Sequence, residues 1–467
     1  MGKEKASHSS PGIPQSQCWS YMIVIFSFLV ITISCGAVYS SPIAMVVFAS
    51  HLDKTYSVIE QTWLGASMLS SMSLSSIVCM PLIRLIGCRG SIILGGFVAA
   101  LGPALAVFCT SLTAICLTMG VLTGIGVGLA LIPALLTVEL HFPRAGNKLA
   151  TTLALSGIGI GVATFPPGLN WLQLNIDYMY CMLILSGTLA IISIMGALMI
   201  APNPMKNSKL TIEIFKEEAL AKPEFLAVCF VNFIWAFGSS IMYIHLPIFT
   251  MQNGHSSEGA AIMLSCIGGL SLFSRGMFRI LHLGEAVTMD TVTSIFCGLC
   301  LTAIFTGLFG DISVKYTGLL GYSMLFGFYV GFWSNFINQI NRETIGQDLA
   351  TGGSGFAMLA TSFGSLAGPP VAGFLYGETD SYKNVFYLAG GCMMFCSLLL
   401  LGVKVSSLPS ARLRHEIVKK IKEGHPKEKV KEAVTKRIKL KSSSQAQRSP
   451  GETQEEANVD SNLLTNV

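Results

Sequence analysis

Twelve long apolar runs dominate the sequence and limit the folds open to it. A helix needs roughly 20 apolar residues to cross the hydrocarbon core of a bilayer. Transmembrane strands are excluded because the runs are long and do not alternate between apolar and polar residues. The sequence therefore predicts an all-α polytopic membrane protein with spans at approximately residues 19–49, 62–83, 91–110, 114–138, 149–173, 179–201, 225–250, 259–281, 287–309, 317–340, 352–376 and 384–405.

The composition excludes several classes of protein. Only 12% of the residues are charged and 52% are hydrophobic, whereas an ordinary soluble domain is about 25% charged. This balance argues against a soluble enzyme, a disordered protein and a nucleic-acid binder. Cys297 and Cys300 form a pair inside an apolar run with no second pair, so free thiols are expected and neither a metal nor a cofactor is predicted.

Basic residues fall unevenly on the two sides of the predicted membrane. Cytoplasmic loops are enriched in Lys and Arg. With the N-terminus in the cytoplasm, twelve basic residues fall in inside segments and only three, Lys54, Lys315 and Lys383, fall in outside loops. An even number of spans returns the C-terminus to the same side. We therefore predict a multi-pass protein with both termini cytoplasmic, and we expect it in the plasma membrane, although the charges do not distinguish this from an internal membrane.

The longest break between spans, residues 202–224, is rich in Lys and Glu and divides the spans six and six. Two six-helix bundles joined by a cytoplasmic loop are the plan of the major facilitator superfamily. The short segment from Arg84 to Gly90 resembles that superfamily's loop between spans two and three, without its usual acidic residue. The predicted parts are a cytoplasmic N-terminus (1–18), an N-terminal bundle (19–201), the central loop (202–224), a C-terminal bundle (225–405) and a cytoplasmic tail (406–467).

Glycines cluster in spans four and five. Small residues let helix backbones approach closely. We expect close helix packing there, and the same faces also suit sliding between helices during alternating access. The residues are Gly120, Gly124, Gly126, Gly128, Gly157, Gly159 and Gly161.

Several segments in the predicted spans together resemble the monocarboxylate transporter family. Their order and spacing cover nearly the whole membrane region. The resemblance implies a transporter of small organic anions or amino-acid-like solutes in a lipid bilayer, with a possible single-span immunoglobulin-like ancillary protein. The segments are Trp19 to Ile25, Gly120 to Gly126 with Pro133-Ala134, His141 to Gly157, Gly368 to Pro370, and Asp380 to Lys383.

Arg275, deep inside span eight, is the leading candidate for a substrate contact. A charge at the centre of a bilayer costs about 2.5–3.5 kcal/mol on insertion scales, so intramembrane charges are functional candidates by default. The resemblance places Arg275 where the family has an arginine thought to hold the substrate carboxylate. A guanidinium can hold a carboxylate through two parallel hydrogen bonds. The alternative is a structural arginine that snorkels or pairs with backbone carbonyls.

Two positions depart from the proton-linked members of that family. Those members have an acid one turn before the arginine, where this sequence has Ser271. They also have a lysine in span one, where it has Tyr39, Ser40 and Ser41. Proton coupling requires a group that binds a proton in one state and releases it in another. Obligatory proton symport is therefore not expected, and Ser271 and Tyr39 are candidate substrate contacts.

Other polar residues within the spans have two interpretations. Asn335 in span ten is a candidate substrate contact, although hydrogen bonding between helices is slightly favoured because buried amides are costly unless paired. Asn232 in span seven is a second amide of this kind. His245, also in span seven, can titrate, but a packed, hydrogen-bonded histidine is the preferred interpretation.

The segment that follows the last span is basic. Residues 412–441 hold 12 Lys and Arg against 4 Glu, with apolar residues at every fourth position in two short stretches. Such stretches fit either amphipathic helices attracted to anionic lipid or solvated charged helices. Residues 442–467 are expected to be disordered.

Together these features predict a secondary transporter or facilitator that moves a small monocarboxylate-like solute by alternating access. A transport-inactive scaffold or sensor that keeps the fold is the alternative, which the altered family signatures and the missing ionisable pair make credible. A membrane-embedded enzyme is not expected, because the spans lack clustered acids and Ser/His pairs.

Overall fold

The computed structural model describes residues 17–52, 54–142, 144–199, 223–281, 289–312, 315–345 and 350–406. Within these ranges the regular structure is helical and contains no strand. The chain forms two compact units, Met1–Ser397 and Leu398–Val467. Beyond a residue or two at their edges, the predicted N-terminus, central loop and basic tail lie outside the described residues.

The first predicted span consists of two helices, α1 (Gln17–Tyr39) and α2 (Ser41–His51). They are separated at Ser40, whose Oγ donates to the carbonyl oxygen of Ala37 at 2.9 Å. Pro42 lies in the first turn of α2. Proline is tolerated there because the first turn of a helix has no partner for its N–H groups.

The second predicted span begins in α3 (Val58–Leu74) and continues into the first part of α4 (Ser76–Ala106). The rest of α4 forms most of the third span. The backbone of α4 leaves the helical conformation at Gly87, with φ of 79° and ψ of 172°. A positive φ suits glycine, which has no Cβ. The predicted turn between spans two and three is therefore made at this glycine, within the segment Arg84 to Gly90.

The fourth span combines three segments, α5 (Leu112–Ile115), the π-helix η1 (Cys116–Leu122) and α6 (Thr123–His141). Gly120 and Gly124 face α3, whereas Gly126 faces α4. A Cβ on Gly124 would lie 2.7 Å from the carbonyl oxygen of Met68. Such a distance leaves no room for a side chain, which confirms the close packing expected at this glycine.

Each of the remaining predicted spans corresponds to one helix. Within the described residues, nine segments are long and apolar enough to cross a membrane. The helices are α7 (Arg144–Asn175), α8 (Tyr178–Leu198), α10 (Pro223–Gln252), α11 (Ser257–Leu281), α12 (Met289–Ile312), α13 (Tyr316–Ile345), α14 (Ala350–Thr379) and α15 (Tyr382–Ser406).

The outward faces of these helices are apolar. Phe97, Phe363 and Phe374 are each more than half exposed, at 57%, 55% and 60%. Lipid tails solvate such side chains, while the helices satisfy their own backbone hydrogen bonds. The chain is a multi-pass membrane protein.

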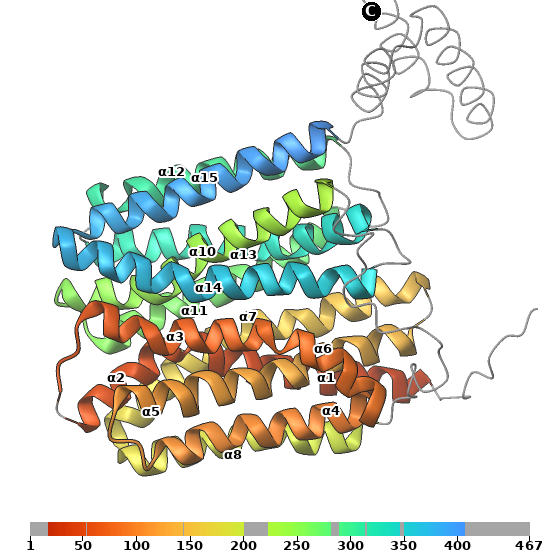
Figure 1. Ribbon diagram of the computed structural model, residues 1–467, viewed down its shortest axis with the longest axis horizontal. Coiled ribbons are helices and arrows are strands. Elements are labelled where there is room, and N and C mark those ends of the chain that lie inside the picture. The colour runs from red at the N-terminus through yellow and green to blue at the C-terminus, as the bar shows by residue number, and fades with distance from the viewer. Residues whose placement is uncertain are drawn as a thin grey trace, which may run out of the picture. The chain divides into compact units, whose positions relative to one another are not determined.

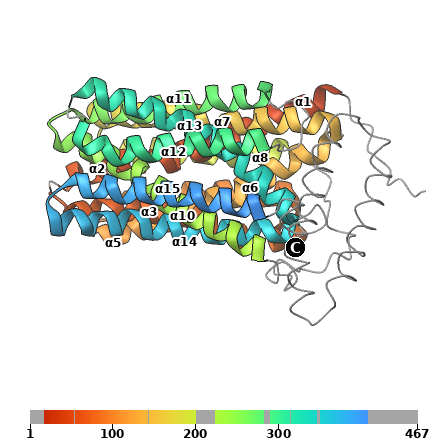
Figure 2. The ribbon, with the colours of Figure 1, turned by 90° about the horizontal axis from the view of Figure 1, so that it is seen from above.

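The helices before and after the central segment pack mainly among themselves. Among the N-terminal helices (α1 to α8), α4 packs on α6 and α8, and α1 packs on α7. Among the C-terminal helices (α10 to α15), α10 packs on α14, and α11 packs on α13. In Figure 1 the N-terminal helices, red to yellow, lie together below the C-terminal helices, and Figure 2 shows the helices running side by side.

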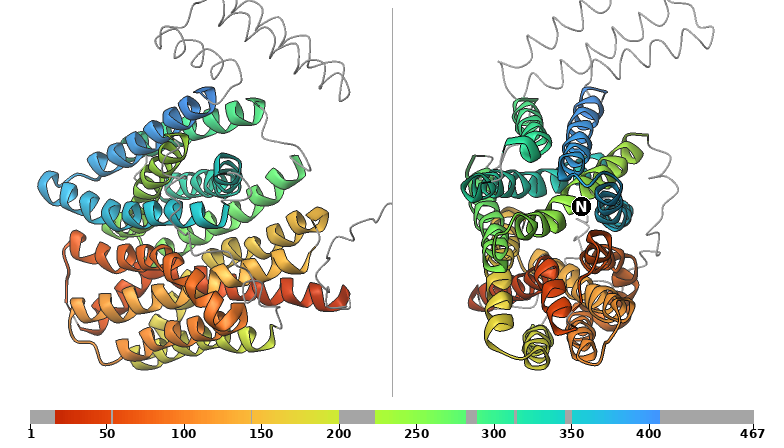
Figure 3. Two further views of the ribbon diagram at one scale, coloured as in Figure 1. Left: turned by 45° about the vertical axis from the view of Figure 1, so that its right-hand side comes forward. Right: turned by 90° about the vertical axis from the view of Figure 1, so that its left-hand side faces the viewer.

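The N-terminal and C-terminal helices meet mainly through two helix pairs. They are α3 with α14 and α7 with α11, and Figure 3 shows the two sets of helices meeting. Across the first pair, the hydroxyl groups of Ser70 and Ser362 lie 2.9 Å apart, and Ser362 Oγ lies 2.9 Å from the carbonyl oxygen of Ser70.

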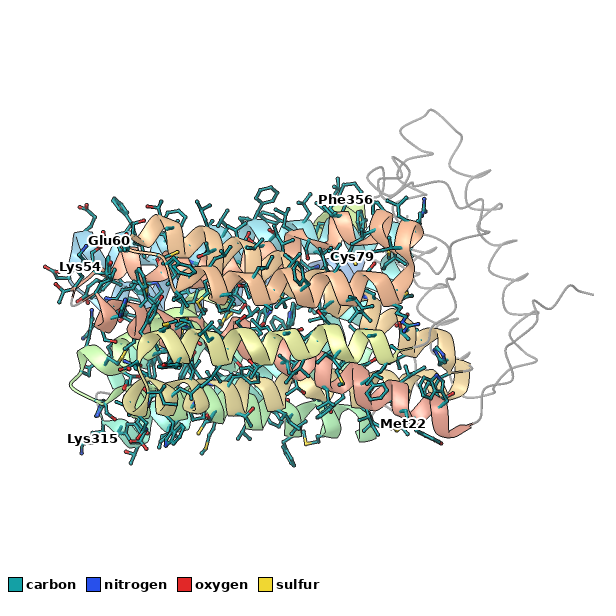
Figure 4. The ribbon with its side chains drawn as sticks, turned by 90° about the horizontal axis from the view of Figure 1, so that it is seen from below. Met22, Lys54, Glu60, Cys79, Lys315 and Phe356 are labelled. Atoms are coloured by element: carbon teal, nitrogen blue, oxygen red, sulfur yellow. The ribbon has the colours of Figure 1, made fainter. Side chains whose placement is uncertain are left out.

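The helices run between two ends of the molecule, shown in Figure 4. Lys54, Glu60 and Lys315 lie at one end, called here the Lys54 end, and Met22 and Phe356 lie at the other, the Met22 end. Glu60 belongs to a capping box at the start of α3, because its carboxylate accepts from the backbone N–H of Ser57 at 2.7 Å. These two hydrogen-bonding residues fix where the helix begins.

Candidate functional site

Arg275 lies in α11, where its side chain is only 4% exposed. Its Nη1 donates a hydrogen bond to the carbonyl oxygen of Leu155, in α7, at 2.8 Å. Burying a charged group is costly unless it is hydrogen-bonded. The carbonyl provides part of that compensation, so Arg275 joins the N-terminal to the C-terminal helices through a charged donor.

Glycines on both helices bring α7 and α11 close enough for this bond. A Cβ on Gly159 would lie 2.8 Å from Cβ of Leu272 and 2.9 Å from the carbonyl oxygen of Gly268. A Cβ on Gly268 would lie 2.6 Å from the carbonyl oxygen of Gly159. A side chain at either position would force the two backbones apart. The close packing expected at the span-five glycines is confirmed at Gly159.

Three titratable groups interact electrostatically with Arg275: Tyr243, Cys35 and Tyr39. Cys35 and Tyr39 lie four residues apart in α1, which places them on one face of that helix. Tyr243 comes from α10. Helices α1 and α10 therefore both place side chains within electrostatic range of the Arg275 guanidinium.

The rings of Tyr39 and Tyr243 contact each other. Their centroids lie 4.6 Å apart and their planes are tilted by 48°. Aromatic rings attract one another at such distances when they are offset or tilted. Because Tyr39 belongs to the N-terminal helices and Tyr243 to the C-terminal helices, this contact also crosses between the two sets.

Ser271 lies one turn before Arg275. Its backbone packs against α13, and its side chain bonds within its own helix. Its side chain is 3% exposed, and its Oγ donates to the carbonyl oxygen of Gly268 at 2.8 Å. A Cβ on Gly331, in α13, would lie 2.8 Å from Cα of Ser271. The structure thus places Ser271 where α11 and α13 pack, and its part in substrate binding stays a prediction.

Of the polar candidates in spans seven and ten, the structure describes the side chains of Asn232 and His245 but not that of Asn335. Asn335 belongs to α13, but its side chain is outside the described residues. Asn232 is 7% exposed, and its Nδ2 donates to the carbonyl oxygen of Val228 in the same helix at 2.8 Å. His245 is fully buried, and its Nε2 lies 2.9 Å from the carbonyl oxygen of Pro369 in α14. The packed, hydrogen-bonded interpretation of His245 is confirmed.

Sequence reasoning missed three participants: Tyr243, Cys35 and the carbonyl group of Leu155. No side-chain pattern can indicate a backbone carbonyl as a hydrogen-bond acceptor. Tyr243 and Cys35 lie in long apolar runs, where an aromatic ring or a thiol is ordinarily a packing residue. Only their proximity to a buried cation gives them significance.

An open hollow of about 500 Å³ lies elsewhere, at the Lys54 end of the C-terminal helices. Phe249, Tyr376 and Tyr382 supply aromatic lining, and Asp380 and Lys383 supply charge. All of these residues come from α10, α14, α15 and the turn between the last two. The hollow is therefore lined without any residue from the N-terminal helices and is separate from Arg275.

A family model described as "Major Facilitator Superfamily" matches residues 21–359, well over half of the chain. This match agrees with the helical architecture of the described residues.

Individual relatives are similar over most of their length. Monocarboxylate transporter 4 of Gallus gallus is 30% identical over 385 residues, which cover 79% of each chain. Monocarboxylate transporter 12 of Xenopus laevis is 28% identical, over 86% of this chain and 91% of its own. Monocarboxylate transporter 6 of Mus musculus is 25% identical, over 85% of this chain and 89% of its own. All three are named as transporters rather than enzymes.

Proposed function

The chain belongs to the monocarboxylate transporter family of the Major Facilitator Superfamily, and we propose that it moves a small monocarboxylate-like organic solute across the membrane by alternating access. The observation that carries this proposal is the buried guanidinium of Arg275, which bridges α11 and α7. A cation in this position is suited to bind an anion that visits the interior of the protein.

In this proposal the substrate carboxylate competes with the carbonyl oxygen of Leu155 for Nη1 of Arg275. Hydrogen bonds between two charged groups are about twice as strong as neutral ones, so an arriving carboxylate has the advantage over a peptide carbonyl. A substrate shifts the balance between two conformations only if it binds them with different affinity. The Arg275–Leu155 bond supplies such a difference, because it joins helices on opposite sides of the interface.

The two positions that differ from proton-linked relatives, Ser271 and Tyr39, give no reason to expect proton coupling. Ser271 and Tyr39 stand where proton-linked relatives have an acid and a lysine. Neither residue exchanges a proton near neutral pH. We therefore propose that transport proceeds without obligatory proton symport.

The sidedness of the molecule follows from the distribution of basic residues. The Lys54 end carries Lys54 and Lys315, two of the three basic residues predicted to lie outside. We propose that the Lys54 end is extracellular in the plasma membrane and that both termini are cytoplasmic. An immunoglobulin-like ancillary protein stays a prediction from the family resemblance.

A second candidate, a transport-inactive scaffold, is favoured by one observation. The hydrogen bond from Arg275 to Leu155 is of the kind that a purely structural arginine makes. A structural arginine stabilises the pairing of α7 with α11 without binding a solute.

Uptake of radiolabelled propionate into proteoliposomes separates the candidates. We expect saturable uptake in the absence of a pH gradient, and an initial rate that an imposed gradient leaves nearly unchanged. Uptake that requires the gradient would show proton symport. Uptake no greater than in protein-free liposomes, for propionate and for larger monocarboxylates alike, would favour the scaffold.

A further inference from the structure

We propose that Tyr39 and Tyr243, called here the tyrosine pair, form the wall of the substrate site on the side of the Lys54 end. The pair sets the size of the solute that fits beside Arg275, and it must separate for that solute to pass toward the Lys54 end. The first part rests on the proposed function, because it assumes a carboxylate at Arg275. The second part concerns access to the site whatever its ligand.

Tyr243, the member of the pair from the C-terminal helices, packs against a second aromatic ring. Tyr243 is 7% exposed, and its ring lies 5.6 Å from that of Phe326 at an angle of 69°. Phe326 is fully buried in α13. The Tyr243 ring thus contacts both Phe326, from its own set of helices, and Tyr39, from the other set.

The N-terminal member lies at a break in its helix. Tyr39 is the last residue of α1, and α2 begins two residues later with Pro42 in its first turn. Discontinuous helices recur at the binding sites of transporters. Tyr39 therefore lies where a change in the angle between α1 and α2 would alter its surroundings.

Neighbouring contacts close the same side of the site. Ile244, the residue after Tyr243, packs against α3 at Gly65, where a Cβ would lie 2.7 Å from Cδ1 of Ile244 and 3.0 Å from Oγ of Ser41. Nearer the Lys54 end, a Cβ on Gly373 would lie 2.8 Å from Cα of Ile59. Helices α2, α3, α10 and α14 thus meet between Arg275 and the Lys54 end.

The chemistry of the pair suits the uncharged part of a carboxylate. A solute with its carboxylate on Arg275 places its organic group against two aromatic rings, whose faces accept apolar surface. Each ring occupies space that a larger substituent would need. A pocket discriminates by size in this way only modestly, by about 10- to 200-fold for one methylene group.

Cys35 provides a probe of closure that does not depend on any substrate. It lies one turn from Tyr39 on the same face of α1, farther from the Lys54 end, and is 2% exposed. Intact cells that express the protein are treated with a membrane-impermeant maleimide, and alkylation of Cys35 is measured by mass spectrometry. Parallel labelling of a Lys54→Cys variant shows whether the Lys54 end faces the reagent, and inside-out vesicles are used if it does not.

We expect Cys35 to be protected in the wild type and alkylated severalfold faster in Tyr39→Ala and Tyr243→Ala. Tyr178→Ala is the matched control, because Tyr178 stacks on His51 at 4.0 Å and donates to the carbonyl oxygen of Ala106, all within the N-terminal helices. Equal protection of Cys35 in all four proteins would overturn the closing role. So would rapid alkylation in the wild type.

Uptake of propionate and of phenylacetate tests the size limit. We expect Tyr243→Ala to lower KM for phenylacetate relative to propionate, whereas Tyr243→Phe, which keeps the ring, and Tyr178→Ala leave the ratio unchanged. An unchanged ratio in Tyr243→Ala would refute the size limit. If no variant takes up either solute while Cys35 becomes reactive as expected, the closing role stands and the proposed function fails.

Discussion

Arg275 and His245 are both buried ionisable side chains bonded to a backbone carbonyl of another helix. Arg275 donates to Leu155 at 2.8 Å, and His245 contacts Pro369 at 2.9 Å. Both side chains bond a carbonyl oxygen because a buried polar group is costly unless it is hydrogen-bonded. The difference lies in the partner helix: Leu155 belongs to the opposite set of helices, whereas Pro369 belongs to the same set as His245.

This difference separates a bond that alternating access must rearrange from one that it leaves intact. In the proposed alternating access, a rocking motion would move one set of helices against the other, so the Arg275–Leu155 bond would change its surroundings during the cycle. The His245–Pro369 bond travels with the C-terminal helices. Burial and polarity alone therefore do not mark a functional residue. In the proposed mechanism, the position of the hydrogen-bond partner is what distinguishes the two residues.

The largest expected effect sharpens this comparison directly. Arg275→Gln should lower propionate uptake by about 10- to 100-fold, because hydrogen bonds to charged groups contribute about 1.5–3 kcal/mol. His245→Gln should leave KM unchanged and act only through protein abundance. Uptake is measured per molecule at the cell surface, with surface biotinylation as the control for folding. Equal loss in both variants would remove the distinction between the two residues.

A second prediction breaks the interface that holds Arg275 near Leu155. Gly268→Val should reduce uptake strongly, because overpacking at a backbone contact costs about 1–3 kcal/mol or more. Gly269→Val is the matched control, since a Cβ on Gly269 meets nothing within 4 Å. The measurement is uptake per surface molecule for both variants. Similar activity of the two would show that close approach of α7 and α11 is unnecessary.

A smaller effect is expected at the other interface, between α3 and α14. Ser362→Ala removes a hydroxyl group bonded across the interface to Ser70, and membrane double-mutant cycles assign about 0.6 kcal/mol to such bonds on average. We expect a small fall in thermal stability with uptake retained. The adjacent Thr361→Ala, whose hydroxyl bonds Ala357 in its own helix, serves as the control. A Ser70→Ala/Ser362→Ala cycle with no coupling energy would contradict the interaction.

The smallest effect concerns the capping box at the Lys54 end. Hydrogen bonds from the side chain and the backbone of Ser57 lower the pKa of the Glu60 carboxyl. Because the folded-state pKa is the lower one, the stabilisation is present above the ordinary pKa of a glutamate. It is lost as pH falls through the folded-state value. Hydrogen exchange at the start of α3 should therefore reveal fraying only in acid, and Glu60→Ala should fray at all pH values. Protection from exchange at the start of α3 that does not fall in acid in the wild type would contradict this.

The sequence predicted the helical architecture well, because twelve long apolar runs leave a chain in a membrane few alternatives. It also placed the turn between spans two and three, which the structure makes at Gly87. It did not indicate the break at Ser40, since a polar residue before a proline also occurs in continuous helices. The boundaries predicted for the two bundles stay predictions.

The site was predictable only in part. Arg275 was singled out because a charge in an apolar span requires an explanation, and the structure shows it buried. Tyr39 was inferred from the family resemblance, and the structure places it among the electrostatic neighbours of Arg275. Tyr243 and the Leu155 carbonyl belong to other helices, α10 and α7, and were found only through packing. No periodicity within one helix contains that information.

Binding of a carboxylate at Arg275 is tested most directly with the purified protein. The unfolding temperature is measured in the presence of propionate and of its uncharged counterpart propionamide, for the wild type and for Arg275→Gln. A ligand that binds only the folded state raises this temperature. We predict that propionate, but not propionamide, raises the unfolding temperature of the wild type. Neither compound should raise that of Arg275→Gln. Equal stabilisation of both proteins by propionate would contradict the account.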